Sequence, residues 1–589
     1  MTRLRFSLAA LLLAMQCMAA AKPAPAPEKV LRGFLTTSET GLDPAVASDL
    51  ATLSVLENLF DPLLRYDYLA RPVALRPNTA AAMPTVAKDG MTYTFQIRRG
   101  LYFTPDPAFK GVRREVTAAD YVYSLTRLYD PALGSPWLFL FEGKLAGDAQ
   151  LKKSFSYTTP IAGLQALDRY TLRIRLNAPD RNFLLYLATP ASSVVAREVI
   201  DAYPGQAGNH PVGTGPFRIG TWKRSDTMVL LANRENVPPF ASTQAGDPVA
   251  AALQGKRLPL LDRIELRIAE EFQGRMLGFL GGEYDLLEQV PESLTGMVID
   301  AGMLKPALAA RAITLTRFPV LQTYYMWMNM EDPVLGGYAK DRVALRRAIA
   351  LSYNSGEDVH LLKKGFAQRA ESPLPPTVLG HDPAYRSPVR YDPALANALL
   401  DRHGYTGRDP DGLRRAPGGA PLTLTMYSEA TITGRLRDEF WRKNLNAIGL
   451  RVVFRSDKKT EIIKASRLGK VQMFESNWVA DFPDADNFYQ LLYGSNRGRA
   501  NYARFDLPEF NRRFDATRMS TDPALRQQLY NEMNDLVHAY NPWVPLTHPI
   551  SADLRHPWVR NYRRHPVELT TWRYLDIDAG MRERVREAR

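Results

Sequence analysis

Apolar and polar residues recur along the chain with two different periods, which predict strands in some segments and helices in others. Residues 93–97 (YTFQI) alternate between apolar and polar positions, as a half-buried strand does, and residues 172–176 repeat this alternation. Residues 49–64 instead place Leu and Phe three or four positions apart on one helical face, and residues 341–353 repeat that spacing. Strands and helices mixed along one chain predict an α/β fold.

Several further segments extend this pattern. Residues 228–232 and 263–268 are predicted to be strands of one sheet, and a predicted helix at 436–448 lies between strands at 422–426 and 451–454. Another helix is expected to begin after Thr117, because Thr is a good N-cap and Asp120 follows three residues later. The Ala- and Gly-rich segment 241–256 is predicted to be a surface loop.

The strongest turn signal is residues 209–220 (NHPVGTGPFRIG), where three glycines and two prolines surround a single Phe. Glycine reaches backbone angles that other residues avoid and proline fixes φ, so this segment is predicted to be a rigid turn that leads into a strand. It contains no nucleophile and no phosphate-binding Gly-Lys-Ser/Thr pattern.

Length and charge limit the function classes. A chain of 589 residues is too long for one ordinary core and predicts two or more lobes. The formal net charge is +13, but the basic residues are dispersed and acidic residues lie between them nearly everywhere. This dispersal argues against a nucleic-acid partner.

The N-terminus is predicted to be a secretory signal. Arg3 and Arg5 precede an apolar run at 6–15, and small residues follow at 18–21, so we expect a signal peptide at 1–21 and a Pro-rich tether at 22–29. Cys17 is the single cysteine and falls inside this signal. The residues before Cys17 do not fit a lipoprotein site, so no lipid anchor is predicted, and the mature chain would hold no thiol.

Residues 211–217 (PVGTGPF) resemble the signature of the periplasmic peptide-binding proteins of ABC importers, solute-binding protein family 5. Other segments resemble family phrases in family order over about residues 30–570: NLFDPLL at 58–64, YTFQIRRGLYF at 93–103, VTAADYVYSLTRLYDP at 116–131 and WVADFPDADNF at 478–488. The resemblance implies a two-lobed periplasmic-binding-protein fold of the large peptide-binding type. It implies lobe I at 30–318 with an extra subdomain at about 65–205, lobe II at 319–545, and a return segment with a basic tail at 546–589.

Three aspartates, Asp481, Asp484 and Asp486, lie close together in the segment 478–488 and allow three interpretations. A calcium loop of the EF-hand type would need a central glycine and a distal Glu that are missing here. A pair of hydrolytic carboxylates would suit a secreted hydrolase. A solvated turn with one ligand-binding acid is the third, and the resemblance favours it: Asp481 would pair with the α-amino group of a bound peptide, while Asp484 and Asp486 would cap local backbone N–H groups.

The resemblance and the strand pattern add further candidate ligand-binding residues. Trp478 is expected to line the pocket or else to belong to the core. Tyr324 and Tyr325 lie where the chain is predicted to cross between the lobes, and strand alternation should turn one to the cleft and the other to the core. Ser38, Glu39 and Thr40 are implied to contact the peptide backbone from lobe I. The histidines are scattered, so no metal site and no cofactor are predicted.

These observations predict an extracytoplasmic binding protein of the periplasm. It would capture a short peptide or peptide-like solute by hinge closure and deliver it, as a monomer, to an ABC transporter permease. The same fold with a haem, a metal chelate or another non-peptide solute is one alternative. A secreted hydrolase that uses Asp481, Asp484 and Asp486 is an alternative from another class.

Overall fold

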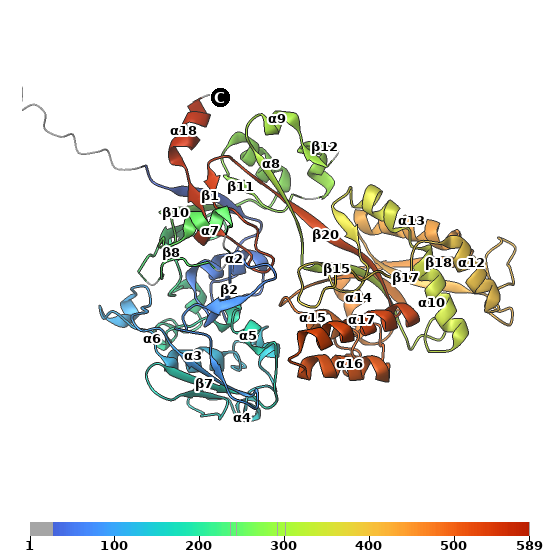
Figure 1. Ribbon diagram of the computed structural model, residues 1–589, viewed down its shortest axis with the longest axis horizontal. Coiled ribbons are helices and arrows are strands. Elements are labelled where there is room, and N and C mark those ends of the chain that lie inside the picture. Colours follow the sequence, from blue (N-terminus) through green and yellow to red (C-terminus); the bar gives the residue numbers. More distant parts are fainter. Residues whose placement is uncertain are drawn as a thin grey trace, which may run out of the picture.

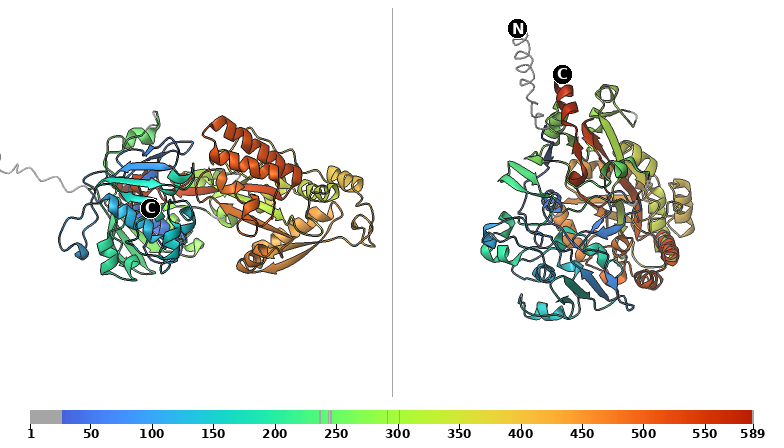
Figure 2. Two further views of the ribbon diagram at one scale, coloured as in Figure 1. Left: turned by 90° about the horizontal axis from the view of Figure 1, so that it is seen from below. Right: turned by 60° about the vertical axis from the view of Figure 1, so that its left-hand side comes forward.

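The computed structural model describes residues 27–235, 237–242, 244, 246–290, 292–300 and 302–587. The predicted signal peptide, Cys17 and most of the predicted tether lie outside the described residues. Two lobes stand side by side and long strands join them, as Figure 1 and the left view of Figure 2 show.

Lobe I is built on a four-stranded sheet in the order β1 (Val30–Leu35), β10 (Arg263–Ile268), β9 (Thr227–Ala232) and β8 (Phe217–Lys223). β1 pairs with β10 in parallel and the other pairs are antiparallel, so the predicted strands at 228–232 and 263–268 do share one sheet. Helix α2 (Leu50–Leu59) contributes Val55, Leu56 and Leu59 to the same core.

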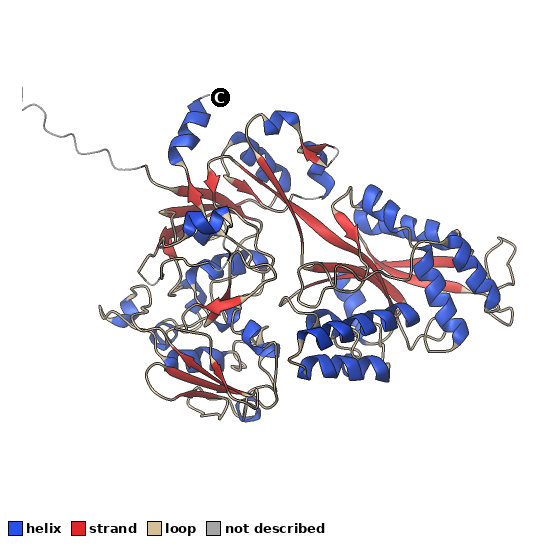
Figure 3. Cartoon of the chain, viewed as in Figure 1, coloured by secondary structure: helices blue, strands red, loops and turns tan. Residues whose placement is uncertain are grey.

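A second sheet of lobe I, lower left in Figure 3, forms a separate subdomain. Its strands run in the order β4 (Thr85–Val86), β5 (Thr92–Gln96), β7 (Thr171–Arg175) and β6 (Leu164–Ala166). Helix α3 (Ala118–Arg127) packs against it and begins as predicted, because Asp120 Oδ2 accepts a hydrogen bond from the Thr117 backbone N–H at 2.7 Å. Reciprocal capping satisfies N–H groups that have no partner inside the helix.

Lobe II is built on a mixed sheet in which β15 (Gln322–Met328), β19 (Met473–Val479), β17 (Thr423–Glu429) and β18 (Arg451–Asp457) follow one another, with β18 at the edge. Successive residues of β15 point to opposite faces, so Met326 and Met328 join one core and Tyr325 and Trp327 join the other. The helices that cover the first face are α10 (Lys340–Ser352), α12 (Pro393–Arg402) and α13 (Ile432–Asn446), and those on the second are α16 (Pro508–Met519) and α17 (Pro523–Tyr540).

Strand β20 (Trp543–Arg555) links the two lobes because its two halves pair with different strands. Its first half pairs with β15, with Trp543 opposite Trp327, and with β16 (Ala367–Arg369). Its second half pairs with β14 (Thr314–Pro319), with Arg555 opposite Thr314, and with β11 (Leu286–Leu287). The chain therefore crosses between the lobes along adjacent antiparallel strands, which Figure 1 shows as the β15 and β20 ribbons.

The Gly-rich turn packs directly on the C-terminal end of α2. Added Cβ atoms would lie 2.0 Å from Leu59 O at Gly213 and 2.5 Å from Asn58 O at Gly215, so side chains at these positions would clash with backbone. The Gly215 N–H donates to Leu59 O at 2.9 Å, and Thr214 Oγ1 donates to Asp61 Oδ2 at 3.1 Å. The turn thus joins two segments that are far apart in sequence and has a structural role.

The prediction of a surface loop throughout 241–256 was wrong in part, because helix α7 (Pro248–Leu253) lies within it. Asp247 caps this helix by accepting from the Val249 N–H at 2.7 Å, and Leu253 is fully buried beside Tyr574.

The last helix, α18 (Ala579–Glu587), also packs on lobe I: Arg582 Nη2 donates to Val30 O and to Asp285 Oδ2. Further elements are α4 (Ala149–Lys153), α5 (Phe183–Tyr186), α6 (Arg197–Ala202), α8 (Phe272–Gly281), α9 (Pro306–Ala309), α14 (Lys459–Arg467), α15 (Asp486–Tyr489), β2 (Leu64–Tyr66), β3 (Leu75–Pro77), β21 (Val559–Arg560) and β22 (Asp576–Ile577).

Candidate functional site

The candidate site is the junction between the lobes, where a turn after β19 meets lobe I. The Asp481 carboxylate is exposed here, and Asn487 holds it: Asn487 Nδ2 donates to Asp481 Oδ2 at 3.1 Å, and Asn487 Oδ1 accepts from the Asp481 N–H at 3.2 Å. The same Oδ1 accepts from Trp478 Nε1 at 2.7 Å. Two predicted site residues, Trp478 and Asp481, are therefore brought together by a third that the sequence analysis missed.

The protein around Asp481 disfavours the charged form of its carboxyl group. Desolvation by the surrounding protein raises the pKa of Asp481, and the Asn487 hydrogen bond acts in the opposite direction. Burial by neighbouring protein disfavours the charged form of a carboxyl group even where solvent still reaches part of it. A cationic partner would stabilise the charged form of this carboxylate through charge-assisted hydrogen bonds, which replace those lost from water.

Asp484 and Asp486 are buried and have other partners. Asp484 is 2% exposed, caps the Asp486 N–H at 3.1 Å as expected, and pairs with Arg526 Nη2 at 3.0 Å. The prediction that Asp486 caps a local backbone N–H group was wrong. Its Oδ2 instead accepts a hydrogen bond from Asn182 Nδ2 of lobe I at 3.0 Å. Burial and the neighbouring Asp484 raise the pKa of Asp486 to about 7. A partner 304 residues away could not be read from local spacing.

The neighbouring tyrosines of β15 lie on opposite faces. Tyr325 is 4% exposed, and its ring stacks on Trp543 with centroids 3.5 Å apart. Tyr324 is half-buried, and Lys363 Nζ lies 4.0 Å from its ring centroid. Tyr324 also borders a cavity of about 150 Å³ in lobe II whose wall includes Met426, Phe474 and Asn477.

This lobe II cavity lies at the carboxyl ends of β17 and β19 and at the start of α13. Arg437 borders it and is neutralised there, because its guanidinium donates to Glu475 Oε2 at 2.7 Å and to Asp358 Oδ1. Crevices at the carboxyl ends of strands are where open α/β sheets bind ligands. The sequence analysis did not single out Arg437 or Glu475.

Two of the three candidates from lobe I, Glu39 and Thr40, have side-chain partners inside that lobe. Glu39 is 7% exposed and accepts from Trp222 Nε1 at 2.7 Å. Thr40 Oγ1 donates to Asp49 Oδ2 at 2.7 Å, next to the start of α2, and Ser38 between β1 and Glu39 is half-buried. The structure does not bring these residues together with Asp481, and their role in binding stays a prediction.

Another part of lobe I offers a charged hollow of about 40 Å³, bordered by Glu57, Arg65, Glu568 and Arg573. Val567, beside Glu568, packs against cores of both lobes, which places this hollow near their junction. Burial and the Glu568 charge raise the pKa of Glu57 to about 8. The sequence analysis did not predict a role for Glu57 or Arg65. The signal that could have indicated one is their position directly before and after the NLFDPLL phrase.

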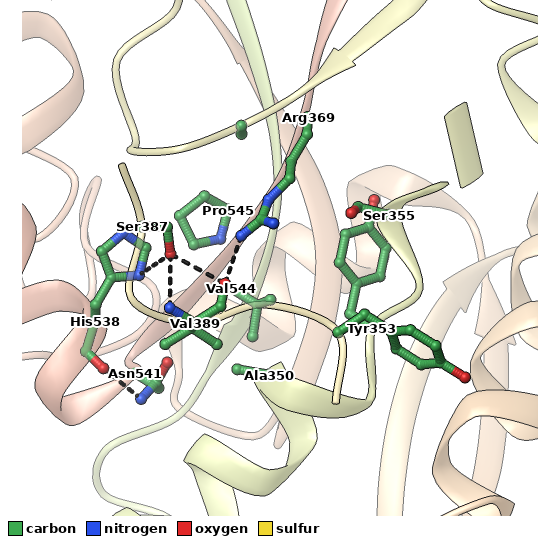
Figure 4. A pocket seen from close by; sticks show the side chains of 12 residues that line it. Ala350, Tyr353, Ser355, Arg369, Ser387, Val389, His538, Asn541, Val544 and Pro545 are labelled. Atoms are coloured by element: carbon green, nitrogen blue, oxygen red, sulfur yellow. Dashed lines mark hydrogen bonds between the residues drawn. The ribbon is translucent and has the colours of Figure 1, made fainter. Parts of the chain in front are cut away.

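A smaller cavity in lobe II, about 20 Å³, contains a Ser–His contact that Figure 4 shows. Ser387 Oγ lies 3.4 Å from His538 Nδ1, while His538 Nε2 bonds the Glu371 carbonyl at 2.9 Å. Burial lowers the pKa of His538 to about 4. Ser387 Oγ also bonds both backbone groups of Val389, so this contact anchors a loop to α17 and does not form a nucleophile–base pair.

No group of three or more His, Cys, Asp or Glu side chains arranged to hold a metal ion occurs among the residues that the structure describes. Over those residues, too, no helix combines the length and apolar character that a bilayer crossing needs.

Two lobes joined by crossing strands, with an exposed acid at their junction, define the class of two-lobed periplasmic binding proteins. The chain belongs to the bacterial extracellular solute-binding proteins, family 5, whose middle-region model matches residues 74–500. It is 28% identical to the di/tripeptide-binding protein 2 of Pseudomonas aeruginosa, over 98% of this chain and 99% of that one. It is 25% identical to the heme-binding protein A of Haemophilus influenzae, over 84% and 82% of the two chains.

Solved structures show the same fold. The periplasmic binding protein DppA from Helicobacter pylori, in complex with the peptide STSA, matches with a TM-score of 0.68 and 22% identity, over 93% of this chain and 98% of that chain. The predicted fold class and family are therefore confirmed.

Proposed function

We propose that this chain is the solute-binding component of an ABC importer and that it captures short peptides between its lobes. The observation that carries the proposal is the exposed Asp481 carboxylate, surrounded by protein at the lobe junction and oriented by Asn487. A peptide α-ammonium would form charge-assisted hydrogen bonds with it in a site from which closure removes water. The family and the di/tripeptide-binding relative support the same reading.

The remaining surfaces suit varied side chains. The lobe II cavity beside Tyr324 is partly apolar, with its arginine already neutralised, so it would accept residues without demanding one charge. The lobe I hollow beside Glu57 and Arg65 carries both signs of charge. Hinge closure would bring these surfaces together, because β14, β15 and β20 cross between the lobes.

The finer features follow from the same proposal. The N-terminal signal would export the chain to the periplasm, where it would act as a monomer, hand its solute to permease subunits and leave it chemically unchanged. The burial of Asp484 and Asp486 supports a binding role over hydrolysis, because neither acid is free to meet a substrate.

Native mass spectrometry of protein purified from rich medium tests this function. Co-purified masses of short peptides, one per chain and unchanged on incubation, are expected. A haem absorption band or a retained metal chelate would favour the alternative cargo suggested by the heme-binding relative. Conversion of the released solute into products would contradict the proposal.

A further inference from the structure

One short turn touches both the candidate solute acid and the opposite lobe. The turn comprises residues 482–487, which we name the coupling turn. At its end Asn487 is fully buried, and its amide holds both Trp478 and Asp481. An amide with both ends bonded has one orientation, so the Asp481 carboxylate is fixed relative to the turn.

The other residues of the coupling turn contact lobe I. Asp486 Oδ2 accepts from Asn182 Nδ2 at 3.0 Å, next to the start of α5. Phe482 packs edge-to-face on Tyr186 of the same helix, with ring centroids 5.4 Å apart. Both contacts lie at α5, in the subdomain of lobe I that contains strands β4 to β7, and not at the crossing of β15 and β20. Figure 1 shows α5 facing α15 of lobe II.

The backbone of the turn leaves little freedom between these contacts. The Leu379 N–H donates to Pro483 O, and the Ala485 N–H donates to Leu379 O, both at 2.9 Å. The Asp484–Arg526 ion pair fixes the middle of the turn to α17. Asp486 and Asn487 are consecutive residues of α15, so a shift of one displaces the other.

We propose that the coupling turn links the seating of lobe I on lobe II to the capture of the solute, with Asn487 as a positioning residue for Asp481. The inference rests on the proposed function, because it gives Asp481 the role of ammonium acceptor. Asn182 and Tyr186 of lobe I hold the turn where Asn487 presents the carboxylate. Lobe contact therefore affects recognition of the solute amino group as well as closure.

Titration of trialanine and N-acetyl-trialanine by calorimetry tests this coupling, since acetylation removes the ammonium. The measured quantity is the ratio of the two dissociation constants. Asn487→Leu is expected to reduce the preference for the free amine about tenfold, as the loss of a hydrogen bond to a charged group would. Asn182→Ala is expected to reduce it by about threefold to tenfold, although Asn182 lies in the other lobe.

Two variants serve as matched controls. Arg181→Lys keeps the positive charge near Asp484 and Asp486 but removes the guanidinium that donates to Ser520 O, a lobe–lobe hydrogen bond outside the coupling turn, so both peptides should weaken equally. Asn531→Leu removes a comparable Asn–Asp hydrogen bond, to Asp382 at 2.8 Å, inside lobe II, and should leave the ratio unchanged. An Asn182→Ala ratio equal to wild type would overturn the coupling.

The outcomes also separate this inference from the proposed function. If Asp481→Asn leaves the preference for the free amine intact, or wild-type protein binds neither peptide, the proposed function fails. If Asp481→Asn abolishes the preference but Asn487→Leu retains it, only the positioning role fails. Should Asn487→Leu not fold, Asn487→Asp keeps the acceptor for Trp478 and places a second charge beside Asp481; an unchanged pH profile of the ratio would then count against the positioning role.

Discussion

The rings of Tyr325 and Trp543 stack at 3.5 Å across two adjacent strands that join the lobes. Tyr325 lies on β15 and Trp543 begins β20, so the stack fixes the place where the chain crosses on its way back from lobe II. The contact is buried in the core that α16 and α17 complete. A residue in this position stabilises the hinge more directly than it recognises a solute.

Tyr325→Ala should therefore lower the free energy of unfolding by about 3–5 kcal/mol, as large aromatic truncations in cores do. Tyr325→Phe keeps the stacked ring and loses only the hydrogen bond between the Tyr325 hydroxyl and Ser476, so it should cost only about 1 kcal/mol. Urea titration followed by tryptophan fluorescence measures both. A stable Tyr325→Ala protein that has lost peptide affinity would instead support a ligand-binding role for this residue.

Gly213→Ala should destabilise the protein by a few kcal/mol, because its Cβ would lie 2.0 Å from Leu59 O and the backbone would have to move. Gly274→Ala is the matched control, since nothing lies within 4 Å of its added Cβ and it sits in helix α8. That control should be neutral or slightly stabilising. Equal melting temperatures for the two variants would contradict the packing role of the Gly-rich turn.

Arg526→Met should lower the free energy of unfolding by about 3–5 kcal/mol, because it leaves the Asp484 carboxylate buried without its cation. The double variant Asp484→Asn/Arg526→Met should recover much of that loss, since no uncompensated charge remains. Thermal unfolding of the single and double variants measures the difference. A double variant less stable than Arg526→Met would contradict this account of the turn.

The lobe contact at Asp486 should weaken as the pH rises from about 4 to about 7. Burial and Asp484 raise the pKa of Asp486 from its usual 3.8 to about 7, with Arg526, Arg518 and Asp180 as the other charges nearby. A raised carboxyl pKa means that the proton is bound more tightly in the contact, so its stabilisation is complete below pH 4 and is lost towards pH 7.

Asp486→Asn mimics the protonated acid and should remove this pH dependence. At pH 8 the variant should be the more stable protein, by a few kcal/mol, because one pKa unit corresponds to about 1.4 kcal/mol. Melting temperatures measured between pH 4 and pH 8 give the difference between the two proteins. Parallel curves over that range would show that Asp486 does not titrate at the contact.

Local patterns in the sequence predicted the elements whose stability is local. The alternation at 93–97 gave β5, and Thr117 with Asp120 gave the start of α3, because strand periodicity and N-capping depend on neighbours a few residues away. The helix inside 241–256 was not predicted, because its burial depends on Tyr574, more than 300 residues further along the chain. The order of the family-like segments along the chain predicted the specific fold class, which periodicity alone could not predict.

The site was predicted only as far as its local motif reached. Trp478 and Asp481 share one segment, and the structure joins them through Asn487, which the same segment contains. The contact of Asp486 with Asn182 and the pairing of Arg65 with Glu568 depend on residues from distant segments, so no spacing rule could reveal them. The family resemblance implied Ser38, Glu39 and Thr40, which follow β1, whereas the side chains of Glu39 and Thr40 bond to Trp222 and Asp49 of lobe I itself.

Small-angle X-ray scattering with and without a saturating co-purified peptide tests most directly whether the lobes close on a solute. The crossing strands and the acid at the lobe junction predict a smaller radius of gyration in the complex, with one unaltered peptide per chain. Asp481→Ala protein should need a higher peptide concentration for the same change. Stoichiometric binding with an unchanged scattering profile would contradict closure around the solute.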